Sequence, residues 1–159
     1  MFKRAARRDS RIWVVVADRA KARIFSAEWE GLTGFRELET LVHPQGAMHA
    51  RDVEADTHGR NRAPDGHRYT TEPAGDFRHR TADAFANRIV ERIDQGRQAG
   101  EFGRLVIAAP PLMLGRLRME LSTVLKDLLV ADFDQELTGL GEKEILARVR
   151  SRLEAVAEV

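Results

Sequence analysis

Two uninterrupted apolar runs constrain the fold of this chain more than any other feature. The runs "RIWVVVAD" (11–18) and "RLVIAAPP" (104–111) lack the alternation of apolar and polar residues that marks a half-buried strand. Strands of this kind are buried on both faces, so we expect helices on both sides of their sheet. The proline pair that closes the second run cannot continue a hydrogen-bonded ladder, and it ends the strand.

The remaining pattern predicts three further strands and three helices. Two strands follow the first run after short polar breaks, which favours an antiparallel meander. The later strands are separated by segments with helical spacing of apolar residues, which favours right-handed parallel crossovers. We therefore predict an α/β fold with a single mixed five-stranded sheet and helices on its faces. The expected strands are 22–29, 35–42 and 126–137, and the expected helices are 81–100, 112–125 and 141–159.

The chain of 159 residues suits one domain, predicted here as residues 11–159 behind a basic N-terminal arm at 1–10. The net charge of +1 gives no overall attraction to nucleic acid, so such binding would need local patches. The absence of cysteine excludes disulfides and thiol chemistry and fits a reducing compartment. Neither a signal peptide nor a membrane span is apparent, so we expect a cytoplasmic protein without a membrane partner; its oligomeric state stays open.

The polar segment 43–80 is the candidate functional site. Its centre, "DTHGRNRAPDGHRYTTEPAG" (56–75), contains no aliphatic residue larger than alanine, and its glycines and prolines predict turns. Loops of this length in small domains are usually functional or disordered. Guanidinium groups match phosphate, and glycine lets the main chain approach a ligand closely. The predicted RNA or partner contacts are Arg51, His58, Gly59, Arg60, Arg62 and Arg68, together with Lys3, Arg4, Arg7 and Arg8 of the arm. The alternative is a disordered insertion, which loop-closure entropy tolerates.

Catalytic constellations find little support. A two-metal nuclease needs converging carboxylates, and although Asp18 ends the first strand, the second central strand ends in "AAPP" without an acid. The five histidines lack the H-x₃-H spacing of a metal site, and no serine lies in G-x-S-x-G. We expect no catalytic residue, metal or cofactor; a metal-dependent hydrolase using Asp18 and loop histidines remains a minor alternative.

Several blocks resemble one known family. "VADRAKARIF" and "IAAPPLMLGRLR" carry most of the likeness, and "HARDVEADTHGR" and "DFDQELTGLGEKEI" add to it. Over roughly residues 11–150 the chain resembles the bacterial host attachment proteins, which are also placed among relatives of the archaeo-eukaryotic release factors. The resemblance implies the fold of the middle, ribonuclease H-like domain of the class-one release factors.

The resemblance also implies where function would reside. In release factors the loop between the third strand and the first helix carries Gly-Gly-Gln and reaches the peptidyl-transferase centre. The corresponding segment here has no Gly-Gly-Gln; its nearest text is "THGRNR" around Gly59, with Gln45 upstream. The expectation is a non-enzymatic ribosome- or tRNA-associated translation factor that contacts RNA through residues 43–80. The alternative is an attachment- or stress-related interaction protein with a protein partner and no RNA binding.

Overall fold

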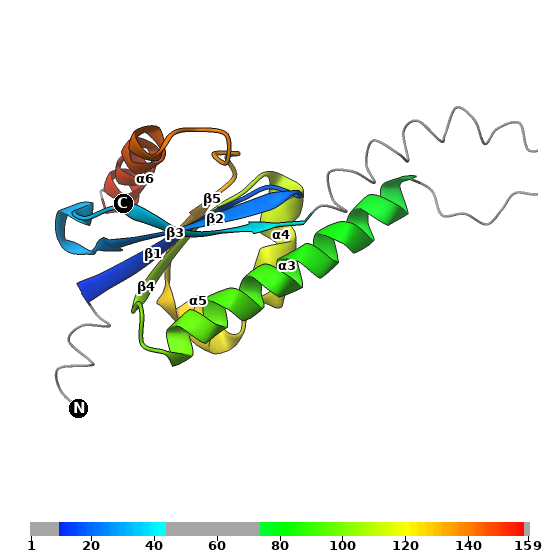
Figure 1. Ribbon diagram of the computed structural model, residues 1–159, viewed down its shortest axis with the longest axis horizontal. Helices are drawn as coiled ribbons and strands as arrows, with labels where there is room; N and C mark the ends of the chain where they lie inside the picture. The colour runs from blue at the N-terminus through cyan, green and yellow to red at the C-terminus, as the bar shows by residue number, and fades with distance from the viewer. Residues whose placement is uncertain (1–9, 44–73, 158–159) are drawn as a thin grey trace, which may run out of the picture.

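Five strands form one sheet in the order β3-β2-β1-β4-β5, as expected for a mixed α/β fold (Figure 1). The structure is a computed structural model that describes residues 10–43 and 74–157, with the backbone alone for residues 74–82. The strands are β1 (Arg11–Ala17), β2 (Lys21–Glu28), β3 (Arg36–Val42), β4 (Arg104–Ala108) and β5 (Leu129–Phe133). The helical elements are η1 (Glu30–Leu32), α3 (Ala74–Gln98), α4 (Pro111–Glu120), α5 (Thr123–Leu128) and α6 (Glu142–Ala157).

Strand direction gives the sheet two chemically different edges. β2 pairs antiparallel with both β1 and β3, whereas β4 pairs parallel with both β1 and β5. Four strands therefore run in one direction and β2 runs against them. We call the edge where β1, β3, β4 and β5 end the carboxyl edge, and the opposite edge the amino edge.

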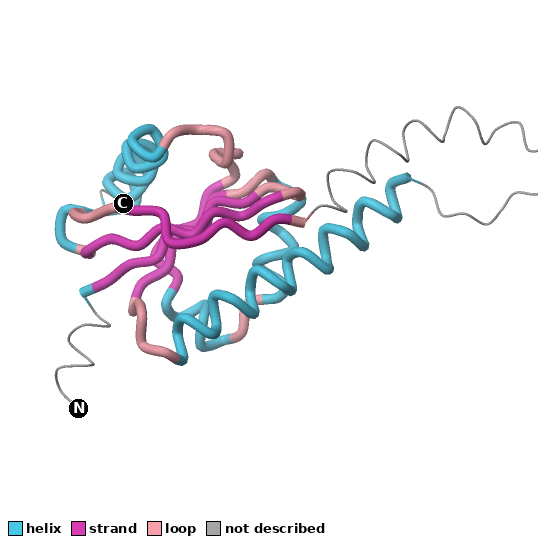
Figure 2. Tube along the Cα trace, in the orientation of Figure 1, coloured by secondary structure: helices cyan, strands magenta, loops and turns pink. Residues whose placement is uncertain are grey.

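Helices cover both faces of the sheet, which explains the two uninterrupted apolar runs. α3, α4 and α5 lie on one face and α6 on the other, with the sheet as a single layer between them (Figure 2). A hydrophobic core lies on each face of the sheet, and alternate residues of β1 contribute to one or the other. Trp13 and Val15 pack with α3 to α5, whereas Val14 and Val16 pack with α6. Residues 12 to 17 are completely buried, so both faces of β1 contribute to stability.

The apolar residues that are spaced as on a helix do face the core in most cases. Phe85, Ile89 and Ile93 of α3 are fully buried, as is Leu117 of α4. Gly100 follows α3 with φ of 72°, the left-handed conformation in which glycine ends helices at little steric cost. None of the helices in the described ranges combines the length and the apolar character needed to cross a bilayer.

Three boundaries differ from the sequence prediction. The strand predicted at 126–137 is shorter, because residues 126–128 belong to α5 and β5 spans only Leu129–Phe133. The polar segment was predicted to extend to residue 80, but α3 already begins at Ala74. Only Phe77 is a large apolar residue in this first part, so no apolar stripe indicates a helix there. The predicted helix at 112–125 is two helices, because Leu121 is extended (φ −64°, ψ 131°) and the hydroxyl of Ser122 accepts the N–H of Leu125 at 3.2 Å as a new N-cap.

The close approach of α3 to β1 depends on Gly96. A Cβ atom added to Gly96 would lie 2.2 Å from Cη2 of Trp13, in a ring that is itself stacked on Phe102 with centroids 4.6 Å apart. The indole fills the space that a side chain would need. Gly115 of α4, by contrast, has nothing within 4 Å of such a Cβ.

Alanine at these two helical glycines should therefore have opposite effects. We expect Gly96→Ala to lower the free energy of unfolding by about 1–3 kcal/mol, because the overpacked indole must shift. Gly115→Ala should raise it by about 0.5–1 kcal/mol, because alanine is the better helix former. Urea unfolding followed by circular dichroism measures both, and equal effects of the same sign would contradict the packing argument.

Candidate functional site

The carboxyl edge of the sheet is the candidate functional site, because both ends of the polar segment are attached there. β3 ends at Val42, and α3 returns to the sheet from Ala74. Open α/β sheets commonly bind ligands outside the carboxyl ends of their parallel strands. The first question is therefore which described side chains are available at this edge.

Asp18 follows β1 directly, and its carboxylate is occupied by the fold. Its Oδ1 accepts the backbone N–H of Ala20 at 2.7 Å and that of Lys21 at 2.8 Å, which closes the turn into β2. Its Oδ2 accepts the hydroxyl of Thr138, a residue only 3% exposed. These three bonds give Asp18 a structural task, and they compete with the metal ligation that a hydrolase would require of it.

Arg23 fixes the segment after β5 to the sheet. Its Nη1 donates to the carbonyl oxygens of Thr138 at 3.0 Å and of Leu140 at 2.7 Å. Its Nε and Nη2 donate to the two carboxylate oxygens of Glu37 at 2.9 and 3.1 Å, a bidentate pair. The Arg23 side chain is 15% exposed, so the network is largely shielded from water.

Arg23 lowers the pKa of Glu37, because its hydrogen bonds favour the charged carboxylate. Burial opposes this by raising the pKa, and a hydrogen bond from Thr40 at 2.7 Å lowers it again. A carboxyl whose pKa is lowered in the folded state stabilises the fold above its unfolded value, here 4.5. That stabilisation is lost as the pH falls through the lowered pKa.

Glu37→Gln should accordingly change the acid response of the protein. At pH 7 we expect the variant to be less stable than the wild type by about 1–3 kcal/mol, the range for a hydrogen bond to a charged group. As the pH falls below about 4.5 and then through the lowered pKa of the folded state, Glu37 takes up a proton and the difference should shrink. Urea midpoints at pH 7, 4 and 3 measure this, and a constant difference across the series would contradict it.

A small hollow lies between the ends of β1 and β4. It has a volume of about 330 Å³, and its lining includes Arg19, Leu112, Met113 and Glu136. Leu112 is 42% exposed at its rim. Across the described residues, no cluster of three or more metal-ligating side chains is present at this edge or elsewhere. The hollow combines apolar side chains with one basic residue, Arg19, and two acidic residues, Asp18 and Glu136.

α3 extends well beyond the sheet on this side. Nη1 of Arg88 donates to the carbonyl oxygen of Val42, the last residue of β3, at 2.6 Å, and His43 stacks on Phe85 with ring centroids 5.0 Å apart. Asp83 still reaches the body, where its Oδ1 lies 3.0 Å from Nε of Arg116. The helix then continues nine residues to Ala74, about 14 Å at 1.5 Å per residue (Figure 1).

The predicted contact residues all lie outside the described ranges. Residues 44–73 contain Arg51, His58, Gly59, Arg60, Arg62 and Arg68. Residues 1–9 contain Lys3, Arg4, Arg7 and Arg8. The structure places only the ends of the polar segment, at the carboxyl edge and at the projecting start of α3.

Sequence reasoning missed Arg23 and Thr138. Arg23 stands in an ordinary strand pattern, and nothing local marks it as the residue that holds a segment more than a hundred positions later. Asp18 did carry a signal, because an aspartate between a strand and the short "RAK" break is typical of a side chain that closes a turn on its own backbone.

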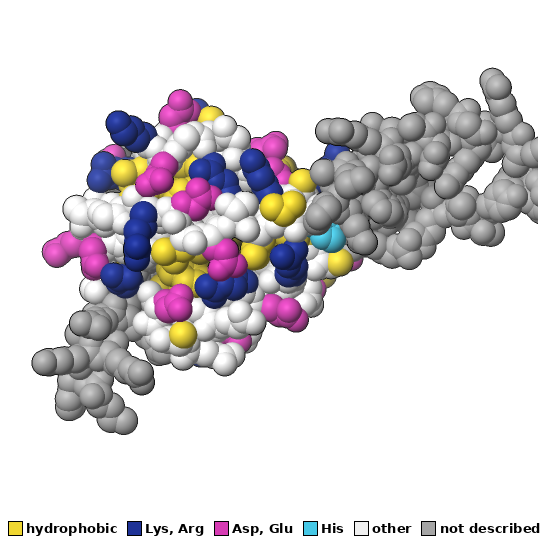
Figure 3. Space-filling view, in the orientation of Figure 1, with side chains coloured by type: hydrophobic (Ala, Val, Ile, Leu, Met, Phe, Trp, Pro, Cys, Tyr) yellow, Lys and Arg dark blue, Asp and Glu magenta, His cyan; other side chains and the backbone are white. Residues whose placement is uncertain are grey.

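Charge on the body is mixed. Lys and Arg side chains alternate with Asp and Glu over the face in view, without a broad basic patch (Figure 3). Arg92 pairs with Glu39 at 3.0 Å, and Arg118 pairs with Asp132 at 2.6 Å. The Arg118 pair lowers the pKa of Asp132, chiefly through their hydrogen bond and against the effect of burial. Paired arginines of this kind leave little net attraction for phosphate.

Comparison with known proteins supports the predicted fold. A family model described as "Protein required for attachment to host cells" matches residues 13–149. Among solved structures, the archaeal translation termination factor aRF1 is similar, with a TM-score of 0.51 and 14% identity over 96% of this chain and 41% of that one. A non-polymerisable quadruple mutant of pCBH ParM is also similar, with a TM-score of 0.51 and 13% identity over 89% of this chain and 48% of that one.

These structural matches show a release-factor-like fold and, at such identities, the fold alone. The chain spans less than half the length of either protein. The search of curated proteins gives no match.

Proposed function

The chain belongs to the family of proteins required for attachment to host cells, and we propose that it acts as a non-enzymatic factor that binds RNA of the translation apparatus, either ribosomal RNA or tRNA. Residues 43–80 would make the main contact. The fold is shared with aRF1, an archaeal translation termination factor. Because the likeness extends to the fold alone, RNA binding by this chain is our own proposal.

The projection of α3 is the observation that carries this proposal. α3 begins at Ala74, about 14 Å along the helix from the contact between Asp83 and Arg116. The point at which the chain enters α3 therefore lies clear of the sheet. A segment attached at such a point can reach a surface that the sheet itself does not touch. In the release factors that this chain resembles, the loop at the corresponding position, between the third strand and the first helix, reaches the peptidyl-transferase centre.

The composition of the segment supports phosphate contact. Arg51, Arg60, Arg62 and Arg68 supply guanidinium groups, which bind phosphate oxygens in pairs, and Gly59 permits a close approach beside His58. Lys3, Arg4, Arg7 and Arg8 would add attraction at the other end of the chain. Because Arg23, Arg92 and Arg118 of the described body are paired with carboxylates, we assign the phosphate contacts in our proposal to these two segments.

The central test is cosedimentation with purified ribosomes. The full chain should pellet with ribosomes at low salt, and deletion of residues 56–75 should abolish most of that binding. Circular dichroism and urea unfolding of the deletion variant serve as the control for folding. Equal pelleting of both proteins would overturn the proposal.

A pull-down with and without ribonuclease separates RNA from protein partners. Loss of the captured material on ribonuclease treatment supports RNA binding. Capture that survives ribonuclease and still requires residues 56–75 would instead support a protein partner, the role that the family description suggests.

A further inference from the structure

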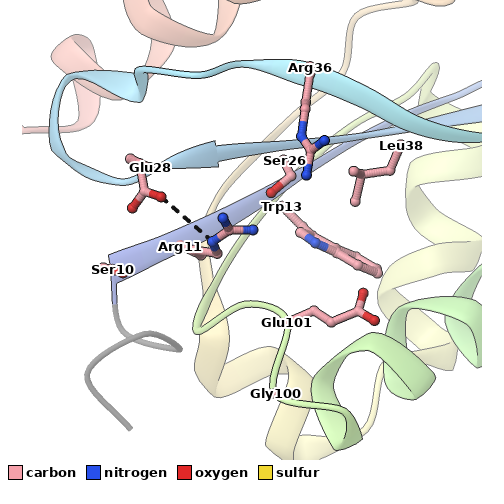
Figure 4. Close-up of a pocket in the computed structure, with 9 residues that line it drawn as sticks. All are labelled: Ser10, Arg11, Trp13, Ser26, Glu28, Arg36, Leu38, Gly100 and Glu101. Atoms are coloured by element: carbon pink, nitrogen blue, oxygen red, sulfur yellow. Dashed lines mark ion pairs between the residues drawn. The ribbon is translucent and has the colours of Figure 1, made fainter. Parts of the chain in front are cut away.

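A second cavity lies at the amino edge of the sheet, opposite the candidate functional site. It has a volume of about 660 Å³ and is formed where β1 begins, β2 ends and β3 begins, closed below by the turn between α3 and β4. Figure 4 shows its lining residues. We call it the amino-edge cavity; the proposed RNA contact does not use it.

One wall of the cavity is a row of side chains across three strands. Trp13 of β1 pairs in register with Ser26 of β2, and Ser26 pairs with Arg36 of β3, so all three point to the same face of the sheet. Leu38 follows on β3 as an apolar neighbour and is 38% exposed. The row combines an aromatic edge, a hydroxyl, a guanidinium and an aliphatic group.

One buried donor in this row lacks a partner. The indole Nε1 of Trp13 has no hydrogen-bond partner although the residue is completely buried. Ser26, its neighbour in register, is 3% exposed and lines the same cavity with its hydroxyl-bearing side chain. A buried tryptophan N–H ordinarily finds an acceptor, because leaving it unpaired is unfavourable. Figure 4 draws the indole nitrogen on the side of the ring toward Arg11 and Ser26.

Charges of both signs face the same cavity without pairing. Arg36 extends into it from β3, above Trp13, and Glu101 from the turn below (Figure 4). Neither side chain has an ion-pair partner among the described residues. Arg11 and Glu28 add a loose pair, with Nε and Oε1 3.6 Å apart. The cavity is thus electrically balanced but divided into a positive side and a negative side.

We infer that the amino-edge cavity binds a small zwitterion of the α-amino-acid class. The ligand's carboxylate would accept from Arg36, the Ser26 hydroxyl and the indole of Trp13. Its ammonium group would donate to Glu101, and an aliphatic side chain would contact Leu38. Each group that the cavity leaves unpaired then gains a partner of the right kind.

Ligands with one charge fit this lining less well. A simple anion would satisfy Arg36 and the neutral donors, but it would lie near the carboxylates of Glu28 and Glu101. A simple cation would pair with Glu101 and leave the guanidinium of Arg36 and the buried indole N–H of Trp13 unsatisfied. A zwitterion is the smallest ligand that meets both requirements, and the pairs it forms are charge-assisted on both sides.

The indole resonance of Trp13 provides a direct readout. The protein has two tryptophans, and Trp29 does not line the cavity, so a Trp29→Phe variant leaves one indole signal in a ¹H–¹⁵N spectrum. Titration with leucine should shift this signal saturably. 4-Methylpentanoate, which lacks the ammonium group, and 3-methylbutylamine, which lacks the carboxylate, should each bind at least tenfold more weakly.

Substitutions at the two unpaired charges complete the test. In the Trp29→Phe background, Arg36→Gln and Glu101→Gln should each weaken leucine binding at least tenfold, and Lys143→Gln on α6 should leave it unchanged. All of these side chains are exposed, so we expect folded variants, checked by circular dichroism. The inference fails if leucine leaves the indole signal in place, or if 4-methylpentanoate binds as tightly as leucine. Ribosome binding that depends on residues 56–75 is measured separately and is not affected by either result.

Discussion

Replacing Arg23 with methionine should lower the free energy of unfolding by about 2–4 kcal/mol at pH 7. This is the largest loss of stability that we expect from any single substitution proposed for this protein. Methionine keeps the aliphatic volume but removes four donated hydrogen bonds. The carboxylate of Glu37 and the carbonyl oxygens of Thr138 and Leu140 would lose their shared partner. Urea unfolding measured by circular dichroism gives the difference.

Arg118→Met is the matched control for this prediction. Like Arg23, Arg118 makes a bidentate pair with a carboxylate: it donates to the two oxygens of Asp132 at 2.8 and 2.6 Å. Its side chain, however, is 54% exposed. Exposed pairs are screened by water, so we expect this variant to lose less than about 1 kcal/mol. Equal losses in the two variants would show that burial of Arg23 has no special importance.

The double variant Arg23→Met, Glu37→Gln tests why the loss occurs. Much of the effect of breaking a shielded ion pair comes from the charge left behind without a partner. Removing the Glu37 charge as well should recover part of the stability. The double variant should therefore lose about 0.5–3 kcal/mol less unfolding free energy than the sum of the losses in the two single variants. Strictly additive losses would indicate that the carbonyl contacts, not the ion pair, dominate.

The main elements of the fold were predictable because their signals are local. The residues of β1 and β4 show no polar alternation, and burial on both faces is the physical reason. The start of α3 was not predictable in this way. Helix periodicity is visible only where one face of the helix packs against a core, and residues 74–80 carry one large apolar side chain.

The contacts that build the two edges were beyond sequence reasoning for a different reason. Thr138 reaches Asp18 across 120 positions, and Arg23 reaches Leu140 across 117, so their pairing follows from the complete topology. The amino-edge cavity depends in addition on strand register. β2 and β3 shift register between Ile24 and Phe25, and this irregularity helps to set Arg36 beside Ser26.

The salt dependence of ribosome binding gives the second large effect that we expect. The triple variant Arg51→Gln, Arg60→Gln, Arg62→Gln removes three proposed phosphate contacts. Each such contact contributes about 0.7–0.9 to the slope of log K against log salt concentration, so the slope should become shallower by roughly 2–3 units. At about 0.1 M salt this corresponds to binding weaker by roughly a hundredfold to a thousandfold, with the two curves converging near 1 M.

The matched control removes three positive charges from the described body. Lys126, Lys143 and Arg148 are exposed on α5 and α6, so Lys126→Gln, Lys143→Gln, Arg148→Gln changes the net charge by the same amount. A long-range attraction that depends only on net charge would respond equally to both triple variants. Direct contact through the polar segment requires the slope to fall only for the first, because counterions are released from phosphates that a side chain touches. Equal slopes for the two variants would therefore exclude Arg51, Arg60 and Arg62 as contact residues, whatever the absolute affinity.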